Sequence, residues 1–98
     1  MKLVLLAEAQ LRFEAEDAWW REHRDAAELF VDEFTQTLEL LTSTPEIGQS
    51  YRVARGKLIR RVLMQKTRCH VYYFHDAEHD LVEIHSVWGA RRQRGPRL

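Results

Sequence analysis

Hydrophobic and polar positions along this chain alternate in a pattern that predicts one strand, two helices and three further strands. The apolar run at residues 2–6 has the length of an interior strand that is buried on both faces. Residues 8–24 contain no glycine or proline and consist mainly of strong helix formers, which predicts a helix of about four turns. Two stripes compete for its buried face: Ala9, Phe13 and Trp20, or Leu11, Ala15, Ala18 and Trp19.

A second helix is predicted directly after the first. Asp25 is followed three residues later by Glu28, as in a capping box, so the helix should begin at Asp25. Pro45 should end it. Between them, apolar residues recur at spacings of three and four: Ala27, Phe30, Val31, Phe34, Leu38 and Leu41. Helices joined so closely are expected to pack as a hairpin.

Three strand-like runs follow, at residues 58–65, 69–75 and 81–88. They are rich in β-branched, aromatic and aliphatic residues, and the breaks between them have hairpin length, so they predict a three-stranded antiparallel meander. Residues 45–57 carry turn formers without a sustained period and are expected to form the loop between helices and sheet.

Alternation in the last run assigns one set of side chains to the helix-facing side of the sheet. That set is Val82, Ile84, Ser86 and Trp88. The 98 residues suffice for one core, so residues 1–98 should form a single domain. The expected fold class is α+β: an N-terminal strand, a two-helix hairpin and the meander, in two layers.

Composition favours a protein of the cytoplasm. The lone Cys69 can form no disulfide within the chain. Residues 1–7 resemble the start of a signal peptide, but Glu8 interrupts the apolar run before it reaches the length of an ordinary hydrophobic region. No later segment approaches the roughly 18 to 20 apolar residues of a membrane helix, so no membrane partner is expected.

The net charge of zero conceals an uneven distribution. Residues 1–48 hold 11 acidic and 4 basic side chains, whereas residues 49–98 hold 4 acidic and 11 basic ones. Such asymmetry favours a polyanionic partner for the basic half. The alternative is that the two halves attract each other within the fold.

The order of elements, together with several local phrases, resembles the RelE/ParE toxin family over nearly the whole chain. These phrases are Ala18-Trp19-Trp20, residues 30–34 (FVDEF), residues 45–48 (PEIG) followed by Tyr51-Arg52, residues 60–63 (RRVL), residues 71–73 (VYY) and residues 87–92 (VWGARR). Each phrase is short, and the specificity lies in their order and spacing.

The resemblance implies the toxin of a type II toxin–antitoxin pair, neutralised by a small cognate antitoxin in a complex that can extend to a higher-order hetero-oligomer. Some members of the family cleave messenger RNA in the ribosome, and ParE-like members inhibit DNA gyrase, so the target must be argued from the site. A non-toxic module that only binds the antitoxin is a third interpretation. No cofactor is expected.

The basic C-terminal half supplies the expected target-binding surface. It comprises Arg60, Arg61, Lys66, Arg68, Trp88, Arg91, Arg92 and Arg94. Arginine donates paired hydrogen bonds that suit phosphate or carboxylate. The alternative is a solvated face without a ligand. These arginines are expected to supply charge rather than stability.

The proton carrier that RNA cleavage favours is missing from its usual places. Where RNA-cleaving relatives carry a histidine, this chain has Gly89, and no tyrosine follows Tyr73. His85 could substitute, although a histidine within a strand is more often structural. The sequence therefore favours gyrase inhibition over ribosome-dependent RNA cleavage.

An aromatic groove on the helices is the expected antitoxin site, formed by Phe13, Trp19, Trp20, Phe30 and Phe34. Trp19 and Trp20 lie about 100° apart around a helix, so one of them should sit at an edge. An exposed indole is a common anchor of a protein interface.

Neither a metal site nor a cysteine nucleophile is expected. The polar cluster His75, Asp76, Glu78, His79 and Asp80 spans an inferred hairpin turn, where polar residues are usual. Cys69 lacks the second thiolate of a zinc motif and a Cys/His pattern nearby.

Overall fold

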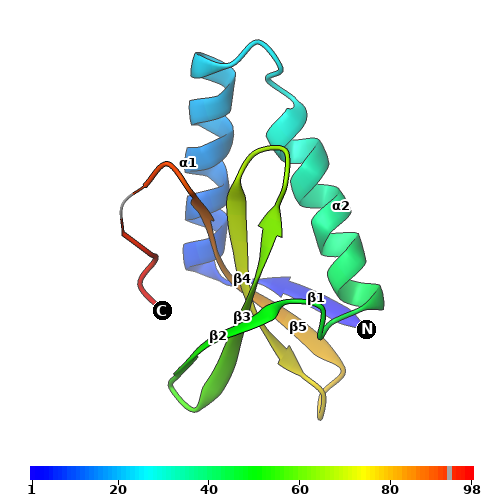
Figure 1. Ribbon diagram of the computed structural model, residues 1–98. Coiled ribbons are helices and arrows are strands. Elements are labelled where there is room, and N and C mark those ends of the chain that lie inside the picture. The colour runs from blue at the N-terminus through cyan, green and yellow to red at the C-terminus, as the bar shows by residue number, and fades with distance from the viewer. Residues whose placement is uncertain (93) are drawn as a thin grey trace.

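Two helices pack on one face of a five-stranded sheet (Figure 1). The computed structural model describes residues 1–92 and 94–98. Its elements are β1 (Lys2–Leu5), α1 (Ala7–His23), α2 (Leu29–Ser43), β2 (Gln49–Ala54), β3 (Lys57–Met64), β4 (Cys69–Asp76) and β5 (Leu81–Gly89). The strand order is β1-β5-β4-β3-β2. The expected α+β class and two-layer arrangement are confirmed, and β3, β4 and β5 form the expected antiparallel meander.

β1 is an edge strand, and the expectation of an interior strand was wrong. It pairs only with β5, in parallel, from Lys2 opposite Leu81 to Leu5 opposite Ile84. Val4 is accordingly 41% exposed. A short apolar run does not distinguish an edge strand covered on one face from a buried central strand.

The loop expected at residues 45–57 contains β2, which pairs antiparallel with β3 and forms the other edge of the sheet. The meander therefore has four strands. The hydrophobic pattern of β2 is weak because most of the strand is exposed and its register with β3 shifts between Ser50 and Arg52. A bulged edge strand lacks the strict alternation from which strands are recognised.

The second helix begins at Leu29 rather than at the expected Asp25. A tight connection separates the helices: the Ala27 amide donates to the Asp25 carbonyl and the Leu29 amide to the Ala26 carbonyl. Glu28 occupies the N-cap position without a side-chain capping bond. Local turn bonds thus replace the capping box that the sequence suggested. The first helix and the end of the second before Pro45 agree with the sequence.

The core lies between the two layers. Phe30 and Phe34 of α2 stack at a ring distance of 5.9 Å, and Phe13 of α1 lies 4.9 Å from Phe34. The first of the two predicted stripes of α1 is the buried one, with Ala9 fully buried and Trp20 8% exposed. The sheet contributes Met64, Cys69, Val71, Tyr73, Val82, Ile84 and Val87.

A bulge in β5 changes which face of the sheet the side chains of its last residues occupy. Tyr72 pairs with Ser86 and Tyr73 with Ile84, so His85 is an extra residue without a partner. Val87 consequently joins the core, while Ser86 and Trp88 lie with Tyr72 and His70 on the face away from the helices. The prediction that Ser86 and Trp88 face the helices was wrong, because a rule of strict alternation along the strand does not account for an inserted residue.

Neither helix of the described residues has the length and hydrophobicity that crossing a lipid bilayer requires.

Candidate functional site

Aromatic and basic side chains meet on the far face of the sheet, which is the face away from the helices. Tyr51 of β2 contacts Tyr72 of β4 edge-on, with ring centroids 4.9 Å apart. The Arg61 guanidinium lies 5.0 Å from the Tyr51 ring, and its partner across the ladder is Tyr72. Neighbouring strands present these side chains to one face because directly opposed residues share a side of the sheet.

His70 continues this cluster along β4. Its ring lies 6.0 Å from that of Tyr72, and it pairs across the sheet with Trp88. Burial lowers the pKa of His70, and the charges of Arg61 and Arg68 lower it further. The imidazole is therefore neutral at pH 7 and can accept a proton.

Tyr72 keeps its proton, because burial raises the pKa of its hydroxyl despite the hydrogen bond with Arg61. The group is a neutral hydrogen-bonding hydroxyl at physiological pH. Across β5, the Arg92 guanidinium lies 4.9 Å from the Trp88 ring. The cluster thus joins a neutral base, a neutral hydroxyl and two permanent cations.

A hollow of about 270 Å³ opens over these side chains. We call it the far-face hollow, and its described lining comprises Tyr51, Arg61, His70, Tyr72, Trp88, Gly89, Ala90, Arg92, Arg94 and Gly95. Its three arginines suit a phosphate group. Its aromatic rings suit a stacked base, and its imidazole suits proton transfer.

The target-binding residues expected from the sequence do not form one surface. Arg61, Trp88, Arg92 and Arg94 line the far-face hollow. Arg60 lies opposite Tyr73, on the helix side, and donates to the Gly48 carbonyl at 3.1 Å. It thereby holds the segment before β2.

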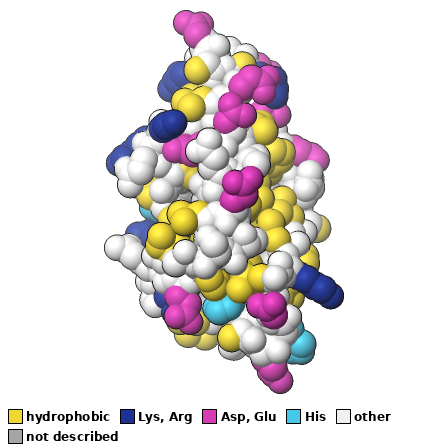
Figure 2. All heavy atoms as spheres, turned by 90° about the vertical axis from the view of Figure 1, so that its right-hand side faces the viewer, with side chains coloured by type: hydrophobic (Ala, Val, Ile, Leu, Met, Phe, Trp, Pro, Cys, Tyr) yellow, Lys and Arg dark blue, Asp and Glu magenta, His cyan; other side chains and the backbone are white. Residues whose placement is uncertain are grey.

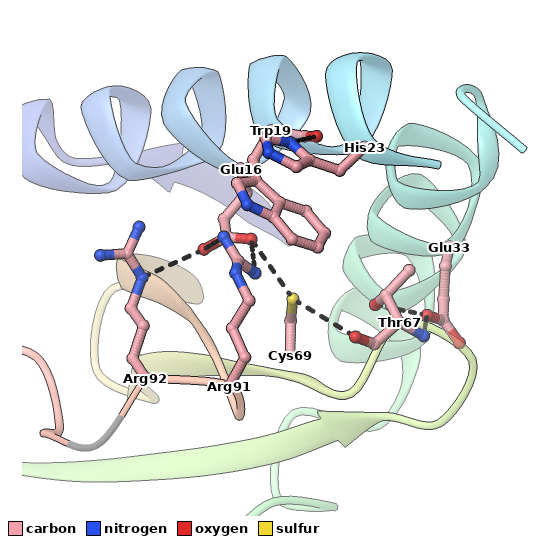
Figure 3. A network of polar contacts seen from close by, with 8 residues as sticks. All are labelled: Glu16, Trp19, His23, Glu33, Thr67, Cys69, Arg91 and Arg92. Carbon is pink, nitrogen blue, oxygen red and sulfur yellow. Dashed lines mark hydrogen bonds and ion pairs between the residues drawn. The ribbon is translucent and has the colours of Figure 1, made fainter. Parts of the chain in front are cut away.

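Lys66, Arg68 and Arg91 lie elsewhere, near Trp19 and Trp20. Arg91 forms a paired hydrogen bond with Glu16 of α1, at 2.7 and 3.1 Å, and Arg92 reaches the same carboxylate at 3.3 Å. Figure 3 shows both guanidinium groups directed at Glu16 from the segment after β5. Glu16 is 1% exposed, so this contact fixes the segment to α1, although Arg91 and Arg92 themselves stay partly exposed.

Cys69 lies under this ion pair, with its Sγ 3.9 Å from Glu16 Oε2. Burial raises the pKa of the thiol to about 12, and the Glu16 charge acts in the same direction. The thiol therefore stays protonated, and that Cys69 is not a nucleophile stays a prediction.

His85 lies outside the far-face hollow. Its Nε2 is 3.1 Å from Glu83 Oε1, which also accepts from Lys57 Nζ at 2.9 Å. The hydrogen bond from Lys57 and, more weakly, that from His85 lower the pKa of Glu83. His85 borders a separate cavity of about 410 Å³ next to Arg97 and Leu98.

The residues expected to bind an antitoxin differ in accessibility. Phe30 and Phe34 are fully or almost fully buried, Trp20 is 8% exposed, and Phe13 packs against this core. Trp19 is half-buried at the surface of α1. One of the two tryptophans thus sits at an edge, as the helical spacing predicts.

The hairpin turn between β4 and β5 brings together Asp76, Glu78 and His79. Asp76 accepts hydrogen bonds from the backbone amide and, at 2.8 Å, the ring Nδ1 of His79. These bonds serve the turn itself, and exposed acidic clusters are common without an ion. The absence of a metal site stays a prediction.

Four residues of these sites were missed from the sequence: Glu16, Tyr51, His70 and Tyr72. Local signals exist for some of them. Glu16 follows Phe13 by three positions and precedes Trp20 by four, which places a carboxylate within the buried stripe of α1. His70 alternates with Tyr72 in a strand, which places both on one face.

The comparisons with known proteins identify the fold. No protein-family model matches the chain, and the search of curated proteins found no relative. One chain in the crystal structure of the intact E. coli RelBE toxin–antitoxin complex is similar, with a TM-score of 0.61 and 15% identity. The match covers 93% of this chain and 98% of that one. This chain has the RelE fold. In the RelE fold of this chain, the far-face hollow lies on the side of the sheet that no helix of the described residues covers.

Proposed function

We propose that this chain is the toxin of a type II toxin–antitoxin pair and that it cleaves RNA in the far-face hollow. The observation that carries the proposal is the neutral His70 beside Arg61, within a hollow lined by stackable aromatic rings. The fold supports the toxin assignment, since the similar chain belongs to a toxin–antitoxin complex.

Cleavage of RNA needs a base, a cationic clamp and a platform for a nucleobase. His70 accepts the proton of a ribose 2′-hydroxyl as its oxygen attacks the adjacent phosphorus. The bond to the 5′-oxygen breaks, water supplies its proton, and a 2′,3′-cyclic phosphate remains. Arg61 and Arg92 stabilise the negative charge that develops on the phosphoryl oxygens.

The aromatic side chains give the hollow its preference for single-stranded RNA. Trp88 and Tyr51 border the hollow on opposite sides of the His70–Tyr72 pair. Stacking of one base on such a ring contributes roughly 1–3 kcal/mol and tolerates any sequence. The rings hold the substrate while Arg61 and His70 act on the phosphate.

Gyrase inhibition was the function that the sequence favoured, because Gly89 and the absence of tyrosine after Tyr73 left no obvious proton carrier. His70 supplies one from a different strand. The proposal therefore departs from that preference, and gyrase inhibition becomes an outcome of the test.

The experiment tests the purified chain against two targets, messenger RNA in a translating extract and DNA gyrase. In a translating extract it should cut messenger RNA, and His70→Gln should lower the cleavage rate by about 100-fold or more, the usual worth of a general base. His79→Gln, at an exposed turn, should cleave like the natural chain. Intact RNA together with stoichiometric inhibition of gyrase supercoiling would overturn the proposal.

A further inference from the structure

A second recess lies on the other side of the segment that follows β5. It has a volume of about 310 Å³ and lies between the C-terminal half of α1 and the turn that joins β3 to β4. We call it the tryptophan cleft, and its principal lining is Trp19, Trp20, Arg24, Lys66, Arg68 and Arg91. Ala90 borders both this cleft and the far-face hollow.

The tryptophan cleft carries positive charge that the protein does not neutralise. No acidic side chain belongs to its described lining. Arg91 pairs with Glu16, but Arg24, Lys66 and Arg68 form no ion pair within the described part of the chain. Unpaired cations in a concave, aromatic site favour an anionic ligand.

The nearby carboxylate of Glu33 forms hydrogen bonds with the β3–β4 turn and does not pair with the described cations of the cleft. It accepts hydrogen bonds from the backbone amides of Lys66 and Thr67, at 2.7 and 2.8 Å, and from the Thr67 hydroxyl at 2.8 Å. Figure 3 shows the Glu33 carboxylate directed at Thr67. These bonds fix the turn that presents Lys66 and Arg68.

Two indoles give the cleft an apolar surface beside its charges. Trp19 stacks with His23 at 4.6 Å, and the guanidinium groups of Arg24 and Arg91 lie 4.6 and 3.9 Å from its ring. Trp20 is 8% exposed, and its indole nitrogen has no hydrogen-bond partner among the described residues. The arginines are thereby held in place by their stacking on rings.

Arg68 occupies a backbone conformation that disfavours it. Its φ is +61°, in the left-handed region where glycine and asparagine are the usual residues. Its amide donates to the Met64 carbonyl and its carbonyl accepts from the Ala90 amide, which fix that geometry. These two backbone hydrogen bonds fix the position of Arg68 beside the recess.

We propose that the tryptophan cleft binds a carboxylate-rich segment of a partner polypeptide, with an apolar side chain of that segment against Trp19. The expected source is the antitoxin, and this part rests on the proposed function. Charge complementarity supports a short acidic segment. A long nucleic acid would also meet residues 1–48, which form the strand β1 and the helices and carry a net charge of −7.

The test uses the full chain and a synthetic peptide of about twelve residues with four glutamates around a Leu-Phe pair. A matched peptide carries glutamine in place of glutamate. Calorimetry should show that the glutamate peptide binds more tightly, and that its affinity falls with added salt. Arg68→Gly should weaken binding by about three- to five-fold, the usual worth of one exposed charge pair, while the thermal midpoint stays equal or rises.

Arg55→Gly is the matched control, because Arg55 also has a positive φ, of +53°, but lies at the opposite end of β3. It should leave peptide binding unchanged. His70→Gln should also bind the peptide normally. Loss of RNA cleavage and loss of peptide binding in the cleft can therefore be distinguished.

Two outcomes would overturn the proposal. One is equal affinity for the glutamate and glutamine peptides, or equal weakening by Arg68→Gly and Arg55→Gly. The other is displacement of the peptide by a uridine dodecamer whose own affinity depends on Arg68, which would make the cleft a nucleic-acid contact.

Discussion

His70 shows how a residue's surroundings can select its role. Its pKa lies below the ordinary 6.5 because the side chain is partly buried and faces the charges of Arg61 and Arg68. A base acts in its neutral form, so the cleavage rate should rise with pH through this lowered pKa and level off above it. The pH profile of kcat/KM, which reports the groups of the free protein, should therefore bend below pH 6.5.

Removal of a nearby charge provides the check on that assignment. In Arg61→Gln the bend should move toward higher pH, because one of the two arginines that lower the pKa of His70 is gone. A bend at the same pH in both proteins would mean that another group titrates.

The ion pair between Glu16 and Arg91, in contrast, is expected to contribute to the stability of the fold. Among the described residues, Arg91→Ala leaves Arg92 as the one cation paired with a carboxylate that is 1% exposed. Loss of one partner of a buried pair is strongly destabilising, and we expect a decrease of about 2 to 4 kcal/mol in the free energy of unfolding. Denaturant titration measures it.

Arg94→Gln is the control for this change, since Arg94 is exposed and forms no ion pair within the described residues. Exposed substitutions usually change stability by less than about 0.5 kcal/mol. A similar small change in Arg91→Ala would contradict the structural role given to the pair.

At the scale of elements, the start of β2 depends on Gly48. A Cβ there would lie 2.6 Å from the Tyr73 hydroxyl and 2.9 Å from the Arg61 carbonyl oxygen, and the Gly48 amide donates to that hydroxyl at 2.8 Å. Tyr73 is fully buried and cannot withdraw. Gly48→Ala should therefore lower the free energy of unfolding by about 1–3 kcal/mol, as overpacking does.

The neighbouring exposed Gln49 offers a comparison in the same segment. Gln49→Ala should leave the denaturation midpoint almost unchanged. Equal midpoints for Gly48→Ala and Gln49→Ala would show that the backbone has room to move there.

The same elements show what the sequence could and could not predict. α1 is rich in helix formers, α2 has a clear apolar period, and β3, β4 and β5 are rich in strand-forming residues, so these elements were found. β2 is a bulged edge strand and was not. In the candidate site, arginine chemistry pointed to Arg61 and Arg92. Alternation in β4 places His70 and Tyr72 on one face, but their position beside Tyr51 and Trp88 needed the register between strands. No local pattern supplies that register because pairing partners lie far apart in sequence.

At the scale of the whole molecule, the division of charge follows the division into layers. The acidic residues 1–48 form β1 and both helices, and the basic residues 49–98 form the other four strands and the tail. Figure 2, which views the molecule from the side of α2, shows acidic side chains over the helices beside apolar ones. A polyanion approaching in solution is therefore steered toward the sheet.

The pairing of β1 with β5 also constrains how the protein can be made. β1 has no partner in the sheet until residues 81–84 have been synthesised. Trp88 and Arg92 of the far-face hollow follow those residues, so a nascent chain shorter than this lacks both the closed sheet and the complete site. Because contacts between distant segments form late in folding, any activity of the hollow requires translation at least as far as Arg92.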